Sequence, residues 1–170
     1  TCCREAGILF LSSAFDEQGI DFLERMGVAA FKLGSGELTN DALLRYAARK
    51  GKPMILSTGM STLEEVEEAV RIVSESGSGE IVLLHCVSCY PARPADANLR
   101  AMETLRRGFD VPVGFSDHTT GVEVSLAAAA LGASVIEKHF TLDRTLPGPD
   151  HRASLEPEEL KALVRGIRKV

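Results

Sequence analysis

Two histidines of this chain lie beside carboxylates, each directly after an apolar run. The stretch GFSDHTTG carries Ser116 and His118, and the later stretch VIEKHFT carries Glu137 and His139. If both runs are parallel strands, alternation puts each pair on one face and brings the two imidazoles together at one rim. Two imidazoles leave most of an octahedral metal shell to water and substrate, which suits Lewis acid chemistry. The alternative is that each histidine only caps a strand end, because this spacing is no specific motif.

Small hydroxyl side chains recur at the ends of five successive apolar runs, and a lysine lies beside them. They are Ser13, Ser35, Ser57, Ser88 and Ser116, with Lys32. Hydroxyls, loop amides and one ammonium make a good site for a phosphate group. The glycines of GSGE would also let backbone amides approach a ligand. The alternative is that these serines are ordinary turn residues, since serine is common in turns.

The elements that must position these residues are short apolar segments, nearly continuous rather than alternating. They cover residues 8–13, 29–35, 53–58, 81–86, 111–116 and 134–140. Such runs predict strands buried on both faces of a parallel sheet. Helical patterns lie between them. The clearest covers residues 61–77, where Ser61 and Glu64 match a capping box and Gly77 matches a helix stop. This alternation predicts an α/β protein with right-handed crossovers.

Two α/β architectures compete. An open doubly wound sheet gathers ligands where its strand order reverses, whereas a (β/α)8 TIM barrel builds its site from the carboxyl ends of many strands. Nearly every predicted strand here ends in polar residues, which favours the barrel. A barrel has eight strands and about 250 residues, while six strand–helix units fit these 170 residues. We therefore expect residues 1–170 to form a single domain, an incomplete barrel from a longer protein or a divergent short form.

Charge and composition argue against several classes of protein. The net charge of −5 argues against general binding to nucleic acid or to anionic membranes. No apolar run approaches the roughly 18 residues of a membrane span, and the opening TCCREAG has no secretory pattern. These features predict a cytoplasmic protein. Cys86 and Cys89 have the spacing of a zinc or redox pair, but without a suitable second ligand pair they are better interpreted as small buried hydrophobic side chains.

Long segments spread over essentially the whole chain resemble one known family. They are FKLGSGELTN, GKPMILSTGMSTLEEVEEAV, LLHCVSCYPA, VGFSDHTTG and VIEKHFTLDRTLPGPDH. These segments resemble the sialic acid synthase family, the phosphoenolpyruvate-dependent synthases of N-acetylneuraminate and related nonulosonic acids. The resemblance implies a (β/α)8 barrel, followed in the family by a small antifreeze-protein-like domain, in a full-length protein that forms a homodimer. It also implies that phosphoenolpyruvate and an N-acetylmannosamine-like sugar condense with release of phosphate.

The resemblance further implies roles for individual residues. His118 and His139 would hold a divalent metal, typically manganese, that polarises the aldehyde of the open-chain sugar. Glu37, Tyr90 and Asp150 would face the sugar or act in proton transfer. The residues that would face phosphoenolpyruvate are Ser13, Lys32, Ser35, Ser57, Ser88 and Ser116. The sequence leaves open whether Asp117 and Glu137 orient the imidazoles or are only solvated, and His85 is expected to be a structural residue of the rim.

The sequence also departs from the family pattern. Nothing in it matches the glutamate, lysine and asparagine that the family uses from its first barrel strands, or the arginine of the C-terminal domain. Val87 and Cys89 stand where many relatives carry threonine and asparagine. We therefore expect the chain on its own to lack turnover partly or wholly. The leading hypothesis is a nonulosonic acid synthase of the sialic or legionaminic branch; the alternatives are a pseudaminic acid synthase and a non-catalytic barrel fragment that keeps phosphate and metal binding.

Overall fold

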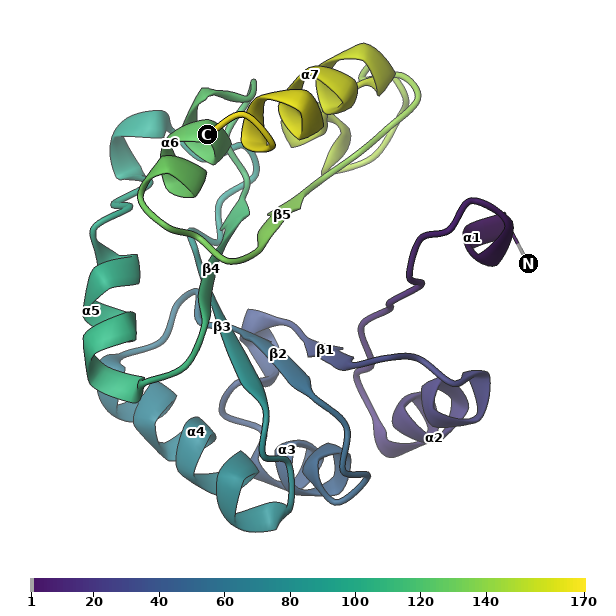
Figure 1. The fold of residues 1–170 in the computed structure, drawn as a ribbon, viewed down its shortest axis with the longest axis vertical. Coiled ribbons are helices and arrows are strands. Elements are labelled where there is room, and N and C mark those ends of the chain that lie inside the picture. Colours follow the sequence, from purple (N-terminus) through teal and green to yellow (C-terminus); the bar gives the residue numbers. More distant parts are fainter. Residues whose placement is uncertain (1) are drawn as a thin grey trace. The chain divides into compact units, whose positions relative to one another are not determined.

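The computed structural model describes residues 2–170, which divide into two compact units, and the boundary along the chain falls within strand β3 (Ile81–Cys86). The first unit runs to Leu83 and the second from Leu84 to Val170 (Figure 1). Each unit is a set of parallel strands joined by helices. No helix among residues 2–170 has both the length and the apolar character needed to cross a bilayer.

The first unit pairs two short strands and covers them with helices. Its strands are β1 (Phe31–Leu33) and β2 (Met54–Ser57) and the beginning of β3; its helices are α1 (Cys2–Glu5), α2 (Glu17–Met26), η1 (Ser35–Glu37), α3 (Asp41–Ala48) and α4 (Leu63–Ser76). β1 and β2 run parallel, with Lys32 opposite Ile55. Figure 1 shows α3 and α4 side by side, and their residues are in contact. Phe31, Leu33 and Met54 are fully buried in this core.

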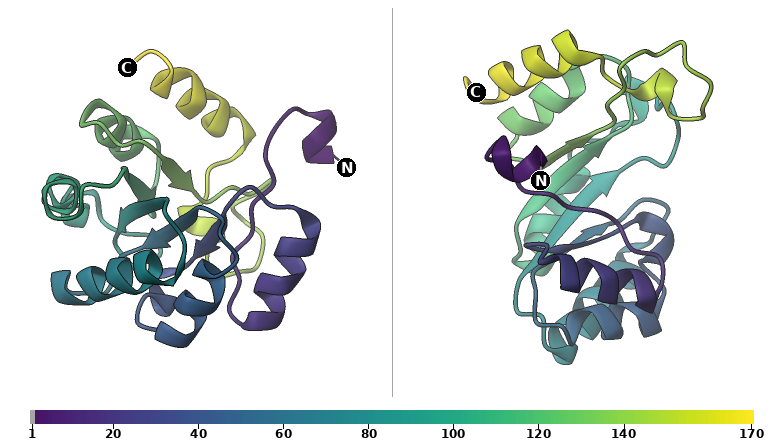
Figure 2. Two further views of the ribbon diagram at one scale, coloured as in Figure 1. Left: turned by 60° about the horizontal axis from the view of Figure 1, so that its bottom comes forward. Right: turned by 90° about the vertical axis from the view of Figure 1, so that its right-hand side faces the viewer.

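The second unit repeats the pattern. It contains the end of β3, β4 (Val113–Asp117) and β5 (Ile136–Lys138), with η2 (Pro94–Asp96), α5 (Ala101–Phe109), α6 (Glu123–Ala130), η3 (His151–Ala153) and α7 (Pro157–Ile167). β4 and β5 run parallel, with Ser116 opposite Glu137 and Asp117 opposite Lys138. Helices α6 and α7 lie side by side (Figure 2). This register puts the residue after each strand, His118 and His139, at the same rim.

The order of the strands distinguishes between the two candidate architectures. It is β1-β2-β3 in the first unit and β3-β4-β5 in the second, which in both follows the order along the chain. A doubly wound sheet reverses its strand order, whereas neighbours in a (β/α)8 barrel follow one another in sequence. The barrel-type fold expected from the sequence is therefore confirmed, and the chain is a partial barrel.

One of the six predicted strands does not form. Of residues 8–13, only Ser13 makes a bridge, with Lys32, and the apolar side chains before it are open to solvent, with Leu9 77 % exposed. An apolar run favours a strand, but a strand also needs a continuous hydrogen-bonding neighbour, and within residues 2–170 this segment has one only at Ser13. The described residues therefore hold five strands rather than six.

The capping box of α4 lies one residue later than predicted. The Thr62 hydroxyl accepts a hydrogen bond from the Glu65 amide at 3.3 Å, and the Glu65 carboxylate accepts one from the Thr62 amide at 2.7 Å. Both Ser61–Glu64 and Thr62–Glu65 fit the same sequence pattern, and in the structure both hydrogen bonds of the box form between Thr62 and Glu65. The predicted stop at Gly77 is confirmed, since this residue ends the helix with a left-handed φ of 119°.

Candidate functional site

Lys32 and Ser57 meet at the rim of the first unit. Lys32 is the middle residue of β1, and its Nζ donates to the Ser57 hydroxyl at 2.9 Å and to the Leu33 carbonyl at 3.4 Å. Ser57 ends β2 and is almost completely buried, and Ser13 is joined to Lys32 by its backbone bridge. The structure therefore brings three of the predicted phosphate-binding residues together. An ammonium beside a hydroxyl is an arrangement that favours a bound anion.

Ser35 and Glu37 lie in η1, the short helix that follows β1. The Ser35 hydroxyl accepts a hydrogen bond from the Gly59 amide at 3.0 Å, which ties η1 to the loop after β2. The Glu37 carboxylate accepts one from the Asn40 side-chain amide at 2.8 Å. Asn40 in turn caps α3, because its side chain accepts a hydrogen bond from the Leu43 amide. Glu37 is thus oriented by a residue that is itself fixed by a helix start.

His118 and His139 form an aromatic cluster with Tyr90 at the rim of the second unit. The centroids of the two imidazoles are 5.3 Å apart, with an angle of 54° between the ring planes. Tyr90 lies 4.2 Å from the His118 ring and meets His139 edge-on at 5.5 Å. The three residues come from the loop after β3 and from the ends of β4 and β5. The expected proximity of the two histidines is therefore found.

The tautomer of His118 follows from its hydrogen bonds. Its Nδ1 lies 2.7 Å from the Val87 carbonyl oxygen, which can only accept, so Nδ1 carries the proton. Nε2 then presents a lone pair, with the Ser116 hydroxyl 3.4 Å away. Burial, more than any other influence, holds the pKa of His118 below its ordinary value. A neutral imidazole with one nitrogen fixed and the other available is the form that binds metals.

The carboxylates around the histidines have separate partners. Glu137 accepts a hydrogen bond from the Ser116 hydroxyl at 2.6 Å, across the register of β4 and β5. The Asp150 Oδ2 lies 4.0 Å from Nδ1 of His139. Asp117 faces α6 instead, where Ser125 donates to it at 2.6 Å. Glu137 and Asp150 thus lie close to the histidine cluster, while Asp117 is directed away from it.

The donor set of this rim fits a divalent metal only in part. Two imidazoles are close together and one is held neutral, but among residues 2–170 no three His, Cys, Asp or Glu side chains form a group that could hold a metal ion. A metal held by His118 and His139 would therefore take its other ligands from water or substrate, as expected of a site for Lewis acid chemistry.

The other residues considered in the sequence have different surroundings from the Lys32–Ser57 pair and the histidine cluster. Ser88 is half-buried in the loop that follows β3. His85 is held by the Ala97 carbonyl, 2.8 Å from its Nε2, and lies against Phe115, which agrees with a structural role. Cys86 is buried as expected, but Cys89 is exposed, so the interpretation as a buried pair is wrong for Cys89.

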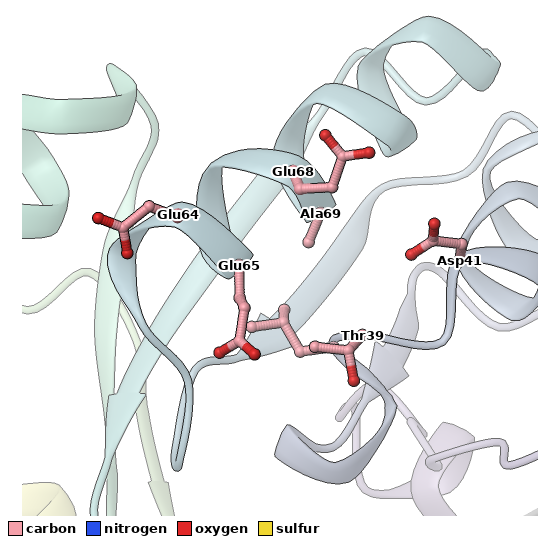
Figure 3. Close-up of a pocket in the computed structure, with 7 residues that line it drawn as sticks. Thr39, Asp41, Glu64, Glu65, Glu68 and Ala69 are labelled. Carbon is pink, nitrogen blue, oxygen red and sulfur yellow. The ribbon is translucent and has the colours of Figure 1, made fainter.

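A groove of about 300 Å³ lies between α3 and α4 in the first unit, and it contains none of the predicted site residues. Figure 3 shows its carboxylates, Asp41 on α3 and Glu64, Glu65 and Glu68 on α4. Two of them have structural partners, because Glu65 completes the capping box and Glu68 pairs with Arg71. An acidic groove of this kind repels phosphate and carboxylate groups, so it is not the site that the sequence predicts.

Sequence reasoning missed Lys138 and Asn40. Lys138 is buried and forms an ion pair with Asp117, Nζ to Oδ2, at 2.9 Å. A lysine within a strand, directly before a candidate histidine, was the available signal, because a buried ammonium needs a partner. Asn40 carried the weaker signal of a helix-capping residue three positions after Glu37.

Parallel strands in chain order, with polar side chains gathered at their carboxyl ends, define the class of (β/α) barrel proteins with a strand-end site. Within that class the family can be assigned. The model of the NeuB family matches residues 1–170, and the chain belongs to this family.

Three relatives illustrate the match. An N,N'-diacetyllegionaminic acid synthase from Legionella pneumophila is 54 % identical over 166 residues, which are 95 % of this chain and 47 % of that protein. The crystal structure of the spore coat polysaccharide biosynthesis protein SpsE from Bacillus subtilis has a TM-score of 0.95 and 44 % identity, and covers 98 % of this chain and 47 % of its own. The crystal structure of an N-acetylneuraminic acid synthetase from Leptospira borgpetersenii has a TM-score of 0.93 and 43 % identity. The match covers 98 % of this chain and 58 % of the synthetase chain. The chain spans about half the length of the curated relatives it matches.

Proposed function

We propose that this chain carries phosphoenolpyruvate- and metal-binding residues of a nonulosonic acid synthase. The proposed reaction joins phosphoenolpyruvate to an N-acetylated sugar such as N-acetylmannosamine and releases phosphate. In it, the enol carbon of phosphoenolpyruvate forms a bond with the aldehyde carbon of the open-chain sugar, water adds to the neighbouring carbon, and phosphate leaves. Relatives named as synthases of legionaminic, sialic and pseudaminic acids support this class of product.

The observation that carries the proposal is the pairing of His118 and His139 at the ends of adjacent parallel strands. Their rings are 5.3 Å apart, and the Val87 carbonyl fixes the tautomer of His118. A strand-end capping role would not require two imidazoles to converge, with Tyr90 packed against both. The active sites of (β/α)8 barrels lie at the carboxyl ends of the strands, which is where these two histidines converge.

In the proposed mechanism, Lys32 binds the phosphoryl group of phosphoenolpyruvate. Its ammonium already donates to the Ser57 hydroxyl, so lysine and serine are held together before the ligand arrives. Such prior organisation lowers the entropic cost of binding. The other hydroxyls assigned to this ligand are those of Ser13, Ser35, Ser88 and Ser116.

His118 and His139 would hold a divalent metal, and manganese is the expected ion. When bound, it supplies a Lewis acid for the sugar aldehyde. His118 offers Nε2 because its Nδ1 proton is committed to Val87. Tyr90 packs against both rings. Glu137 holds the Ser116 hydroxyl close to His118.

Glu37 and Asp150 are the proposed groups for contact with the sugar and for proton transfer. Asn40 orients the Glu37 carboxylate, and Asp150 stands 4.0 Å from His139 on a half-exposed side chain. A carboxylate in this setting can accept a hydrogen bond from a sugar hydroxyl or exchange a proton with it. The second candidate function, a non-catalytic chain that binds phosphoenolpyruvate and metal, uses the same residues without turnover.

Calorimetric titration of the chain with manganese and with phosphoenolpyruvate tests the proposal. The parent chain is expected to bind both ligands, and the His118→Ala/His139→Ala double variant is expected to lose manganese while keeping its fold. His85→Ala is the matched control, because it removes an imidazole of the same unit that is held by the Ala97 carbonyl. Equal manganese affinity in the double variant and the parent would refute the metal assignment.

A phosphate-release assay separates the two candidate functions. The substrates are phosphoenolpyruvate, N-acetylmannosamine and manganese, and N,N'-diacetylated sugars test the legionaminic branch. We expect no turnover by the chain alone. We expect turnover by a chimaera in which this chain replaces the matching residues of the Legionella pneumophila synthase. A folded chimaera that binds both ligands without releasing phosphate would favour the non-catalytic function.

A further inference from the structure

Asp117 and Lys138 form a buried ion pair directly before the two histidines. They are register partners in β4 and β5, and their side chains are 0 % and 3 % exposed. The carboxylate of Asp117 accepts four hydrogen bonds or ion-pair contacts, from the Thr119 amide and hydroxyl, from Ser125 on α6, and from Lys138. The pair therefore lies on the helix-facing side of the strands, and its carboxylate is fully used by the protein.

The ammonium of Lys138 holds both neighbours of His118. Besides Asp117, it donates a short hydrogen bond to the backbone carbonyl of Thr119. His118 stands between these two residues, while Lys138 is itself followed by His139. The side chain of the residue before His139 thus contacts the residue on each side of His118, the carboxylate of Asp117 and the backbone carbonyl of Thr119. None of these contacts involves a group that faces the proposed ligands.

We propose that Lys138 is a positioning residue that sets the separation of the His118 and His139 imidazoles through Asp117 and Thr119. The proposal rests on the proposed function, because a fixed separation matters where both rings hold one ion. Metal ions bind strongly only when their ligands are held at the required distances, and supporting contacts around the ligands determine that geometry. Lys138 supplies the support from β5 and Ser125 supplies it from α6.

The energetics of the pair favour a role beyond stability. Removing two charges from water is costly, and a well-packed neutral pair often stabilises a protein as well or better. In this chain the charged pair is buried directly beside the two histidines in spite of its desolvation cost. Its ammonium contacts two acceptors, one on each side of His118 in the sequence. A neutral residue of the same length fills the space but cannot hold both acceptors.

The main test uses the double variant Asp117→Asn/Lys138→Met, which removes both charges and retains the shapes. An asparagine can still accept from Thr119 and pair with Ser125, so the turn after β4 is kept. Leu105→Ala is the matched control, because it removes a buried apolar side chain of α5 in the same unit and lowers stability without touching the network. Ser125→Ala is a milder variant that removes one hydrogen bond to Asp117.

Two measurements are made on each chain. The first is the manganese dissociation constant, expected to rise by about 10- to 100-fold in the double variant and to stay within about twofold of the parent in Leu105→Ala. The second is nitrogen-15 NMR of the histidine rings in the metal-free chain. In the parent, His118 is expected as the Nδ1–H tautomer with ring-to-ring cross-peaks to His139. In the double variant, mixed tautomers and weakened cross-peaks are expected.

The two measurements separate the possible failures. If the double variant folds and keeps the parent tautomer and cross-peaks, Lys138 is not a positioning residue and the proposal is overturned. If the parent binds no manganese, the metal assignment fails, while the NMR spectra of the metal-free chains still decide the role of Lys138. If the double variant does not fold, Lys138→Gln decides, because this single change removes the ammonium that holds Asp117 and Thr119. A tautomer and cross-peaks identical to those of the parent in Lys138→Gln would overturn the proposal.

Discussion

The two units of the chain each carry a lysine within a strand, and the two lysines have different surroundings. Lys32 of β1 reaches the rim and donates to the Ser57 hydroxyl, whereas Lys138 of β5 is buried against the Asp117 carboxylate. Both residues are half-buried as a whole, but the side chain of Lys138 is only 3 % exposed and lies against a fully buried carboxylate. A lysine within a strand can thus donate to a hydroxyl at the rim or form a buried ion pair, and the partner distinguishes the two settings.

Removal of each charge gives the largest expected contrast between these lysines. Lys138→Met leaves Asp117 buried without its cation, and breaking a buried pair in this way costs about 3–5 kcal/mol of unfolding free energy. Lys32→Met, at a half-buried position, is expected to cost less than about 1 kcal/mol. Urea unfolding of the metal-free chains measures both values. Equal losses of unfolding free energy in the two variants would show that the two lysines contribute equally to stability and would contradict the contrast between them.

For binding of phosphoenolpyruvate we expect the opposite order, with the larger effect from substitution of Lys32 than from substitution of Lys138. In Lys32→Met the affinity for phosphoenolpyruvate should fall by roughly 1.5–3 kcal/mol, the range for a charge-assisted hydrogen bond. Lys52→Met is the matched control, because Lys52 lies in the same unit and donates at 2.9 Å to the Val28 carbonyl. Calorimetry with phosphoenolpyruvate supplies the affinities. A similar loss in both variants would assign the effect to net charge rather than to the site.

The contrast between the lysines also marks the limit of what the sequence predicts. Lys32 was found because GSGE and a serine follow it, which are local features. The partner of Lys138 depends on the register of β4 and β5, and a slip of one residue would send every side chain to the opposite face. The same dependence on neighbours explains residues 8–13, whose apolar run predicts a strand although only Ser13 finds a bridging partner among residues 2–170.

The histidines, by contrast, could be placed from the sequence. Each follows an apolar run that ends at the carboxyl edge of a parallel sheet, and parallel neighbours bring such residues together whatever the fine details of packing. What the sequence left open was the role of the adjacent carboxylates. The structure answers this with contacts to Ser116 for Glu137 and to Ser125 and Lys138 for Asp117.

The pH dependence of stability is expected to differ between the two units, since all four histidines lie in the second. Burial lowers the pKa of both His85 and His118. The unfolded chain then binds more protons than the folded chain, so the stability of the second unit is complete above about pH 6.5 and falls as the pH drops below it. The loss is at most about 1.4 kcal/mol per pH unit for each histidine.

Hydrogen exchange of the metal-free chain at pH 7.5 and 5.5 measures this difference unit by unit. Amides of the second unit should lose protection on acidification, while those of the first unit should keep theirs after correction for intrinsic exchange. His85→Gln should reduce the change, because glutamine can donate to the Ala97 carbonyl without titrating. Acid sensitivity shared equally by both units would contradict the assignment to the buried histidines.

The smallest expected effect concerns the start of α4 in the first unit, for which both Ser61 and Thr62 fit the sequence pattern of a helix cap. Thr62→Ala removes the side chain that accepts from the Glu65 amide, and loss of such a cap costs about 1 kcal/mol, within a range of roughly 0.5–2 kcal/mol. Ser61→Ala is expected to change the unfolding free energy by less than about 0.5 kcal/mol, because the hydrogen bond of its hydroxyl to the Gly59 carbonyl is long, at 3.4 Å. Both variants lie in the loop after β2, whose Gly59 amide is tied to Ser35. If Ser61→Ala is the more costly change, the helix begins one residue earlier than the structure has it, and the position of this loop beside the Lys32 rim must be revised.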